Sequence, residues 1–194
     1  MADSQPLIPP ELTARLAHPT VRLSGPIDGG AAAGFLDQIL PVLDVPGSLV
    51  VELFSPGGDA DIGCRLAQEV RLLSELHGRD MWFLGKTLVA PAAVTFMAGF
   101  TRDRRWLTRD TTLLIHGRRI TRDIHLEGPL GSCRRVLEEL IADIDNGLRI
   151  EDGGFAELIE GSTVSLEEIR RPSYGGWYLT APQALELGLI AGII

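Results

Sequence analysis

Hydrophobic positions along the chain follow two different spacings, and the change between them marks strands and helices. Residues 20–25 and 48–54 form apolar runs of strand length, and the second has the continuous apolar character of a central parallel strand. Residues 31–43 and 59–76 carry apolar side chains at steps of three and four, which predicts helices with one buried face. We expect Gly78 to end the second helix.

The same two spacings continue to the C-terminus. The further predicted strands cover 81–84, 105–107 and 111–116, and the further predicted helices cover 91–100, 132–145, 155–159, 165–169 and 180–187. We expect a turn over 85–90. Because strands and helices alternate without a long linker, residues 20–194 are expected to form a single α/β domain built from right-handed crossovers. The Pro-rich residues 1–19 are expected to be a loose N-terminal arm.

Composition and charge remove several classes of function. The chain has 194 residues and a net charge of −8, and its cations are all arginine except Lys86, so a nucleic-acid partner is not expected. Cys64 and Cys133 lie in no CxxC or Cys/His cluster, which excludes a disulfide scaffold and gives no expected metal site. No apolar run is long enough to span a membrane, and residues 1–10 do not resemble a signal peptide. The cytoplasm is therefore the expected location.

Two features stand where α/β folds carry chemistry. The turn Ser55-Pro56-Gly57-Gly58 follows a buried strand and opens a helix, where free backbone N–H groups meet negative charge. An equally good interpretation is a tight turn whose glycines supply positive φ angles. His116 ends an apolar strand, where it is placed either to act on a ligand or simply to form a hydrogen bond at the sheet end.

In chain order, these pieces resemble the proteolytic subunit of the Clp proteases. The motifs that carry the resemblance are Ser24-Gly25, the turn at 55–58, the small-residue helix at 90–99, Leu113-Leu-Ile-His116 and residues 177–189. Signal-peptide peptidases and the crotonases share some of them. The resemblance implies a ClpP/crotonase-like α/β fold, in which repeated β-β-α units form a spiral core with helices packed outside.

The resemblance also implies a catalytic triad, which this chain does not complete. His116 matches the general base, but the position 25 residues before it is Pro91, and a register shifted by one gives Ala90. The position of the aspartate falls at Pro172. The donors of the oxyanion hole would be Gly58, beside Gly57, and Ala92, so a peptide carbonyl could still bind.

Three hypotheses remain from the sequence. The first is a catalytically degenerate ClpP-like scaffold, partner subunit or peptide-binding module. The second is an active serine peptidase with another nucleophile, for which Ser55 is the nearest candidate. The third is a crotonase-like enzyme that binds an acyl-CoA thioester. No cofactor is expected of the first two.

The resemblance further implies partners. Family members assemble into rings, so we expect a homo-oligomer or a hetero-oligomer with an active homologue, and an ATP-dependent unfoldase is a possible further partner. The segment 117–140 corresponds to the handle between rings and carries several aliphatic residues among its charges.

Overall fold

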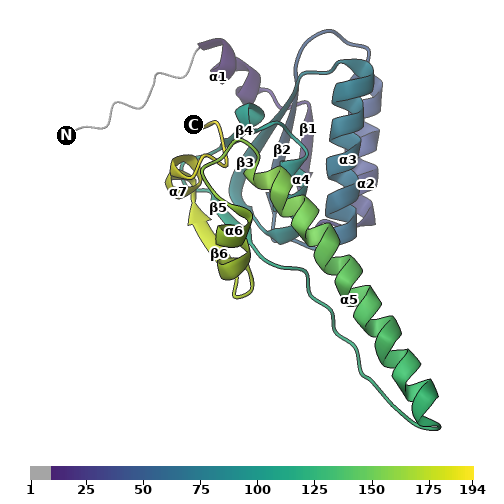
Figure 1. Cartoon of the computed structure of the whole chain (residues 1–194). Coiled ribbons are helices and arrows are strands. Elements are labelled where there is room, and N and C mark those ends of the chain that lie inside the picture. Colours follow the sequence, from purple (N-terminus) through teal and green to yellow (C-terminus); the bar gives the residue numbers. More distant parts are fainter. Residues whose placement is uncertain (1–9) are drawn as a thin grey trace.

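A mainly parallel sheet forms the centre of this computed structural model, which describes residues 10–194 (Figure 1). Five strands pair in parallel in the order β1 (Val21–Ser24), β2 (Leu49–Ser55), β3 (Met81–Val89), β4 (Arg105–Leu107) and β7 (Gly192–Ile193). β5 (Thr112–Ile115) runs parallel to the end of β3, and β6 (Trp177–Thr180) pairs antiparallel with β5. The α/β class expected from the sequence is therefore confirmed.

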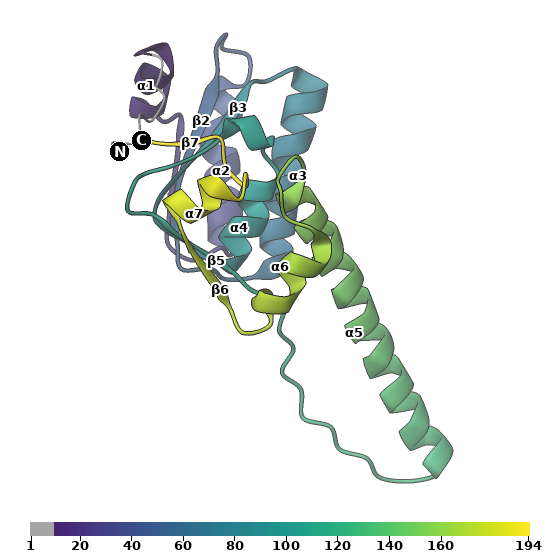
Figure 2. The ribbon, with the colours of Figure 1, turned by 60° about the vertical axis from the view of Figure 1, so that its left-hand side comes forward.

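Helices surround this sheet. The helical elements are α1 (Pro10–Ala17), α2 (Gly29–Ile39), η1 (Leu40–Val42), α3 (Ala60–His77), α4 (Pro91–Ala98), η2 (Arg102–Arg104), α5 (Leu130–Ile159), α6 (Leu166–Ser173) and α7 (Ala181–Glu186). α2 and α3 lie side by side along one face of the sheet (Figures 1 and 2). The main core lies between this face and the helices, where Phe35, Phe83, Phe96 and Phe100 stack edge to face or tilted against one another.

Two glycines let α3 and α4 approach each other closely. A Cβ atom on Gly63 would lie 2.5 Å from the carbonyl oxygen of Ala92, and one on Gly99 would lie 2.6 Å from the Cα of Ala67. No larger residue fits at either position without moving backbone. This contact fixes the first turn of α4 against the first turns of α3.

The N-terminal segment differs from the expected loose arm. Residues 10–17 form α1, and the fully buried Leu16 packs with Val50, Trp82 and Leu84 on the opposite face of the sheet. The sequence interpretation missed this helix because two prolines and a short amphipathic run obscured it. Residues 1–9 lie outside the described residues, and the boundary of a single domain at residue 20 stays a prediction.

Two further boundaries differ from the sequence prediction. β3 continues to Val89 instead of ending at residue 84, because a bulge between Gly85 and Val89 places Thr87 at a φ of 62° and lets the strand continue. α5 is one helix of 30 residues instead of two short ones. Phe155 and Leu158 bury its C-terminal end in the core, and this packing offsets the weak helix propensity of its glycines.

The N-terminal half of α5 projects away from the sheet (Figures 1 and 2). The segment 117–129 runs outward from the end of β5 to the tip of this helix and returns through it. The projection exposes large apolar side chains on both segments: Ile120, Ile124, Leu126, Leu130, Val136, Leu137, Ile141, Ile144 and Leu148. From here on, "the arm" means residues 117–150 and not the N-terminal segment.

Candidate active site

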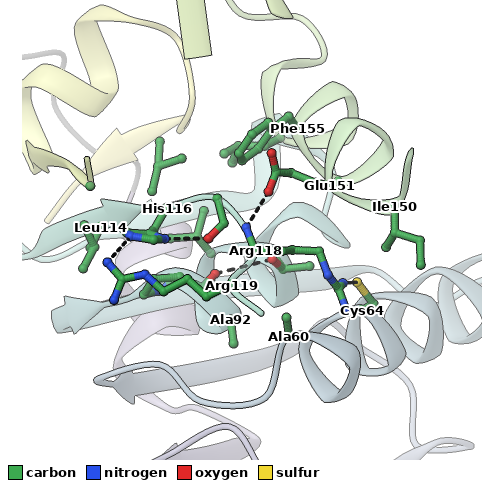
Figure 3. A pocket seen from close by; sticks show the side chains of 18 of the residues that line it. Ala60, Cys64, Ala92, Leu114, His116, Arg118, Arg119, Ile150, Glu151 and Phe155 are labelled. Carbon is green, nitrogen blue, oxygen red and sulfur yellow. Dashed lines mark hydrogen bonds between the residues drawn. The ribbon is translucent and has the colours of Figure 1, made fainter. Parts of the chain in front are cut away.

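A cavity of about 650 Å³ opens between α3, α4, α5 and the end of β5 (Figure 3). Four of the residues singled out in the sequence line it: Gly58, Pro91, Ala92 and His116. They come from three separate segments of the chain, because Pro91 and Ala92 are neighbours, so the fold brings them together. Ser55, Gly57 and Pro172 do not line this cavity.

The turn after β2 is held by its own backbone and by Ser55. The Ser55 hydroxyl is fully buried, accepts a hydrogen bond from the N–H of Gly57 (3.1 Å) and donates to the Gly57 carbonyl (3.4 Å). Gly57 has a φ of 108°, and a Cβ atom there would lie 3.2 Å from Cδ of Pro91. Ser55 and Gly57 therefore shape the turn and support Pro91 from behind the cavity.

Gly58 and Ala92 line the cavity, and the backbone N–H group of each is without an acceptor among the described residues. The flanking residues of the turn bond to Ile27, with Ile27 N donating to Gly57 O (2.8 Å) and Asp59 N donating to Ile27 O (2.8 Å). The Gly58 N–H has no acceptor among the described residues. Ala92 is the second residue of α4, so its N–H precedes the first bond within the helix. Both donors remain available to an oxygen atom in the cavity.

Pro91 occupies the cavity wall at the first position of α4, while Ala90 is the buried N-cap behind it. Of the two registers considered for the nucleophile, the one at Pro91 therefore faces the cavity. No serine is among the described residues that line it. Its hydroxyl groups belong to Thr95, which bonds the Pro91 carbonyl at 3.4 Å, and to Tyr178.

His116 is held by its own segment. Its Nδ1 donates to the carbonyl of Gly117 (2.5 Å), and its Nε2 accepts a hydrogen bond from the guanidinium of Arg119 (2.6 Å; Figure 3). Because a guanidinium has only donors, this pattern assigns the proton to Nδ1 and uses the lone pair of Nε2. The nitrogen that would receive a nucleophile's proton is thus already occupied.

Pro172 lies in the last turn of α6 and forms no contact with the imidazole of His116 that would orient it. The neighbouring residue Ser173 instead accepts a hydrogen bond from the N–H of Gly117 through its carbonyl (3.1 Å). The residue after Pro172 therefore supports, through its backbone, the segment that follows His116.

Cys64 supplies the only thiol among the described lining residues. Burial raises the pKa of the Cys64 thiol, and the nearby guanidinium of Arg118, whose Nη1 lies 3.9 Å from Sγ, opposes the rise only in part. Arg118 also pairs with Asp61 at the start of α3. A raised pKa keeps the sulfur protonated at neutral pH, so Cys64 is a poor nucleophile.

Glu151 adds a carboxylate that sequence reasoning missed. It projects from α5 into the cavity wall, is 8% exposed, and accepts a hydrogen bond from the N–H of Arg118 (Figure 3). Arg118, Arg119 and Glu151 belong neither to the regularly spaced apolar positions nor to the motifs of the sequence. Their charge alone gave no signal, since charged residues are dense throughout the arm.

The described residues contain no group placed to hold a metal ion and no helix able to cross a membrane. Within residues 10–194, no group of three or more His, Cys, Asp or Glu side chains is placed to hold a metal ion. Across the same range, no helix combines the length and apolar character needed to cross a bilayer.

Known proteins share the fold of this chain. No family model matches the chain. A solved structure of a ClpP1 mutant from Listeria monocytogenes superimposes with a TM-score of 0.70 at 18% identity and covers 95% of this chain and 94% of that one. The fold is therefore that of the ClpP-like proteins.

Sequence similarity identifies the family. The chain is 30% identical over 182 residues to the ATP-dependent Clp protease proteolytic subunit 2 of Treponema pallidum, covering 90% of this chain and 81% of the relative. The chain belongs to the family of Clp protease proteolytic subunits. The resemblance inferred from its motifs is thereby confirmed.

Proposed function

We propose that this chain is a non-cleaving, peptide-binding subunit of a Clp-type assembly. The observation that carries the proposal is the pairing of Nε2 of His116 with Arg119 in a cavity whose nucleophile position is Pro91. An imidazole without a hydroxyl to deprotonate forms no acyl-enzyme. The cavity and its N–H donors are retained although the cleavage chemistry is not.

Peptide binding is supported by the donors at Gly58 and Ala92. Both N–H groups line the same cavity and lack an acceptor among the described residues, so a peptide carbonyl or terminal carboxylate would satisfy them. The wall is partly apolar, with Val94, Phe155 and Leu158 available to a peptide side chain.

Labelling with a fluorophosphonate probe tests the loss of catalysis. Intact-mass spectrometry of the natural protein should show no adduct after exposure to the probe, and the same sample should bind a fluorescent peptide. An adduct at any residue of the cavity would establish an active serine peptidase instead. Ser55, fully buried behind the turn, is the first position to map in that case.

Assembly is proposed through the arm. Leu130, Leu137, Ile141, Ile144 and Leu148 recur at steps of three, four and seven on α5, and all are exposed. A solvent-facing apolar stripe of this length is a typical surface for association. We propose that it joins copies of this chain, or joins the chain to an active homologue.

The remaining partners and the location rest on family membership and composition. We propose that an ATP-dependent unfoldase delivers peptides to the assembly, since the Treponema relative is the proteolytic subunit of an ATP-dependent protease. Cys64 and Cys133 are both free, which supports a reducing compartment such as the cytoplasm. A thioester of coenzyme A bound in the cavity, measured by calorimetry, would instead favour the crotonase-like alternative.

A further inference from the structure

Glu151 is the one buried carboxylate among the described residues, and no part of the proposed peptide-backbone site uses it. Its side chain comes from α5 and lines the cavity beside the apolar residues Ile150 and Phe155 (Figure 3). A carboxylate in such surroundings loses its hydration and is stable only with hydrogen bonds or an opposite charge. Its partners therefore show what the site lacks.

The partners of Glu151 within the described chain are few. Its only hydrogen bond comes from the N–H of Arg118, and no cation of the described residues lies within ion-pair distance. The guanidinium of Arg118 turns instead to Asp61. Arg170 is near enough to interact electrostatically with Glu151, but its Nε donates a hydrogen bond to Oδ1 of Asp152 at 2.7 Å.

The guanidinium of Arg119 is also engaged, at His116. A carboxylate accepts about four hydrogen bonds, so Glu151 keeps most of its capacity open. The contrast with Arg105 is direct, because that buried guanidinium makes five hydrogen bonds to backbone carbonyls. The chain satisfies its buried cation fully, whereas the second oxygen of Glu151 has no partner among the described residues and stays accessible from the cavity.

Gly117 determines where the carboxylate points. A Cβ atom on Gly117 would lie 3.1 Å from Oε2 and 3.6 Å from Oε1 of Glu151, so both oxygens lie against the backbone next to His116. A peptide bound at the donors of Gly58 and Ala92 passes along the same cavity. One of its side chains can reach Glu151 from there.

We propose that Glu151 forms an acidic subsite that receives a lysine or arginine side chain of the bound peptide. The apolar residues around Glu151 accommodate the aliphatic stem, and the carboxylate accepts hydrogen bonds from the ammonium or guanidinium group. This proposal rests on the proposed peptide-binding function and adds its specificity.

The test compares peptides that differ only in charge. Fluorescein-labelled seven-residue alanine peptides with lysine or norleucine at the centre are titrated into the natural protein at low ionic strength, with fluorescence anisotropy as the readout. The lysine peptide should bind at least tenfold more tightly. Glu151→Gln, which keeps an acceptor for the Arg118 N–H, should reduce this preference to within twofold.

Glu138→Gln is the matched control, because it removes one negative charge from the exposed part of α5 and should keep the tenfold preference. If the natural protein binds both peptides equally, peptide binding stands and the acidic subsite is overturned. That comparison uses no variant, so it decides the question even if Glu151→Gln fails to fold.

Butylguanidinium separates the two proposals if neither peptide binds. A shift of the Glu151 carboxyl carbon resonance on adding butylguanidinium to the natural protein would support the subsite and overturn the peptide-binding function. No shift together with no peptide binding would overturn both.

Discussion

The guanidinium of Arg119 donates a hydrogen bond to Nε2 of His116 across 2.6 Å, and the two residues are separated by only two others in the chain. The contact is local, so it forms wherever the segment after β5 takes this path. It places a donor-only group where a catalytic imidazole needs a free lone pair. If the chain does not cleave peptides, as we propose, Arg119 and Pro91 are two of the obstacles to cleavage, and each can be removed separately.

Restoring catalysis should require both changes. Pro91→Ser supplies a hydroxyl but leaves Nε2 of His116 occupied, so we expect slow labelling by a fluorophosphonate. Adding Arg119→Ala to Pro91→Ser should raise the labelling rate at least tenfold, because general-base assistance contributes about 10²–10⁴-fold. The rate is measured by intact mass over time.

The control for that experiment is Arg122→Ala in the Pro91→Ser background, because Arg122 pairs with Asp143 on the arm, away from His116. Equal rates for the Arg119 and Arg122 variants would contradict a blocking role for Arg119.

Gly58 is expected to tolerate no side chain. Its φ is 150°, and a Cβ atom would lie 2.3 Å from the carbonyl oxygen of Ile27, which is backbone and has no free rotamer. Gly58→Ala should lower the free energy of unfolding by about 3 kcal/mol through strain and forced displacement. Urea denaturation measures this change.

Gly147→Ala should change the free energy of unfolding in the opposite direction in the same assay. Gly147 lies inside α5 with nothing within 4 Å of the added Cβ, so the substitution should stabilise the protein by about 0.5–1 kcal/mol. If Gly58→Ala causes no loss of stability while Gly147→Ala shows its expected gain, the turn at Gly58 can relax.

Arg105 should be one of the most sensitive positions for stability. Burial lowers the pKa of Arg105 to about 10, which still leaves the guanidinium charged at neutral pH. It donates to the backbone carbonyls of Ala98, Phe100, Glu157, Leu158 and Leu189. Arg105→Met leaves these acceptors unpaired and should cost about 3–5 kcal/mol by chemical denaturation. A loss below about 1 kcal/mol would show that water replaces the guanidinium.

Asp80 should make the stability of the folded protein depend on pH in the acidic range. Burial alone would raise the pKa of Asp80, but hydrogen bonds from Ser48 and Trp82, together with the charge of Arg104, lower it below its usual range. The folded protein then binds the proton later than the unfolded chain, so this contribution is complete above about pH 4 and is lost as the pH falls further.

Melting temperatures of the natural protein and Asp80→Asn test this contribution. The natural protein should melt higher at pH 7, and the gap should close as the pH falls toward 2.5. A gap that persists at pH 2.5 would assign the effect of Asp80 to packing instead of charge.

Charges placed on the arm should separate the assembly. Ile141→Glu combined with Leu148→Glu puts two carboxylates into the exposed apolar stripe of α5. Sedimentation velocity should show a smaller species than the natural protein forms. Because both side chains are already exposed, the melting temperature of the isolated chain should change by less than about 2 °C. An unchanged sedimentation coefficient would contradict assembly through this stripe.

The sequence predicted the elements that have regularly spaced apolar residues and missed those that depend on tertiary contacts. β2 and α3 follow from continuous and periodic apolar runs, and Gly78 ends α3 as predicted. The continuity of α5 through Gly153 and Gly154 comes from burial of Phe155, which no local pattern records. Tertiary packing overrides propensity there.

The candidate site divides in the same way. Gly58, Pro91, Ala92 and His116 were found because short motifs in a known order carry them. Glu151 and Arg119 were not found, because a charged residue on a polar segment shows its role only through its partner. The partner of Arg119 is fixed by the path of the chain after β5, and that of Glu151 by the space which Gly117 leaves empty.

The bulge in β3 also determines how the cavity can change its width. β5 joins β3 at two paired positions, Leu88 with Thr112 and Val89 with Leu113, and β6 is attached through β5. The wall that carries His116 and Tyr178 is therefore attached to the sheet through a short stretch of strand pairing. The wall that carries Gly58 and Pro91 follows the longer pairing between β2 and β3. Few backbone hydrogen bonds hold β5 to β3, so the burial of Leu113 and Ile115 in the core is what limits any change in the width of the cavity.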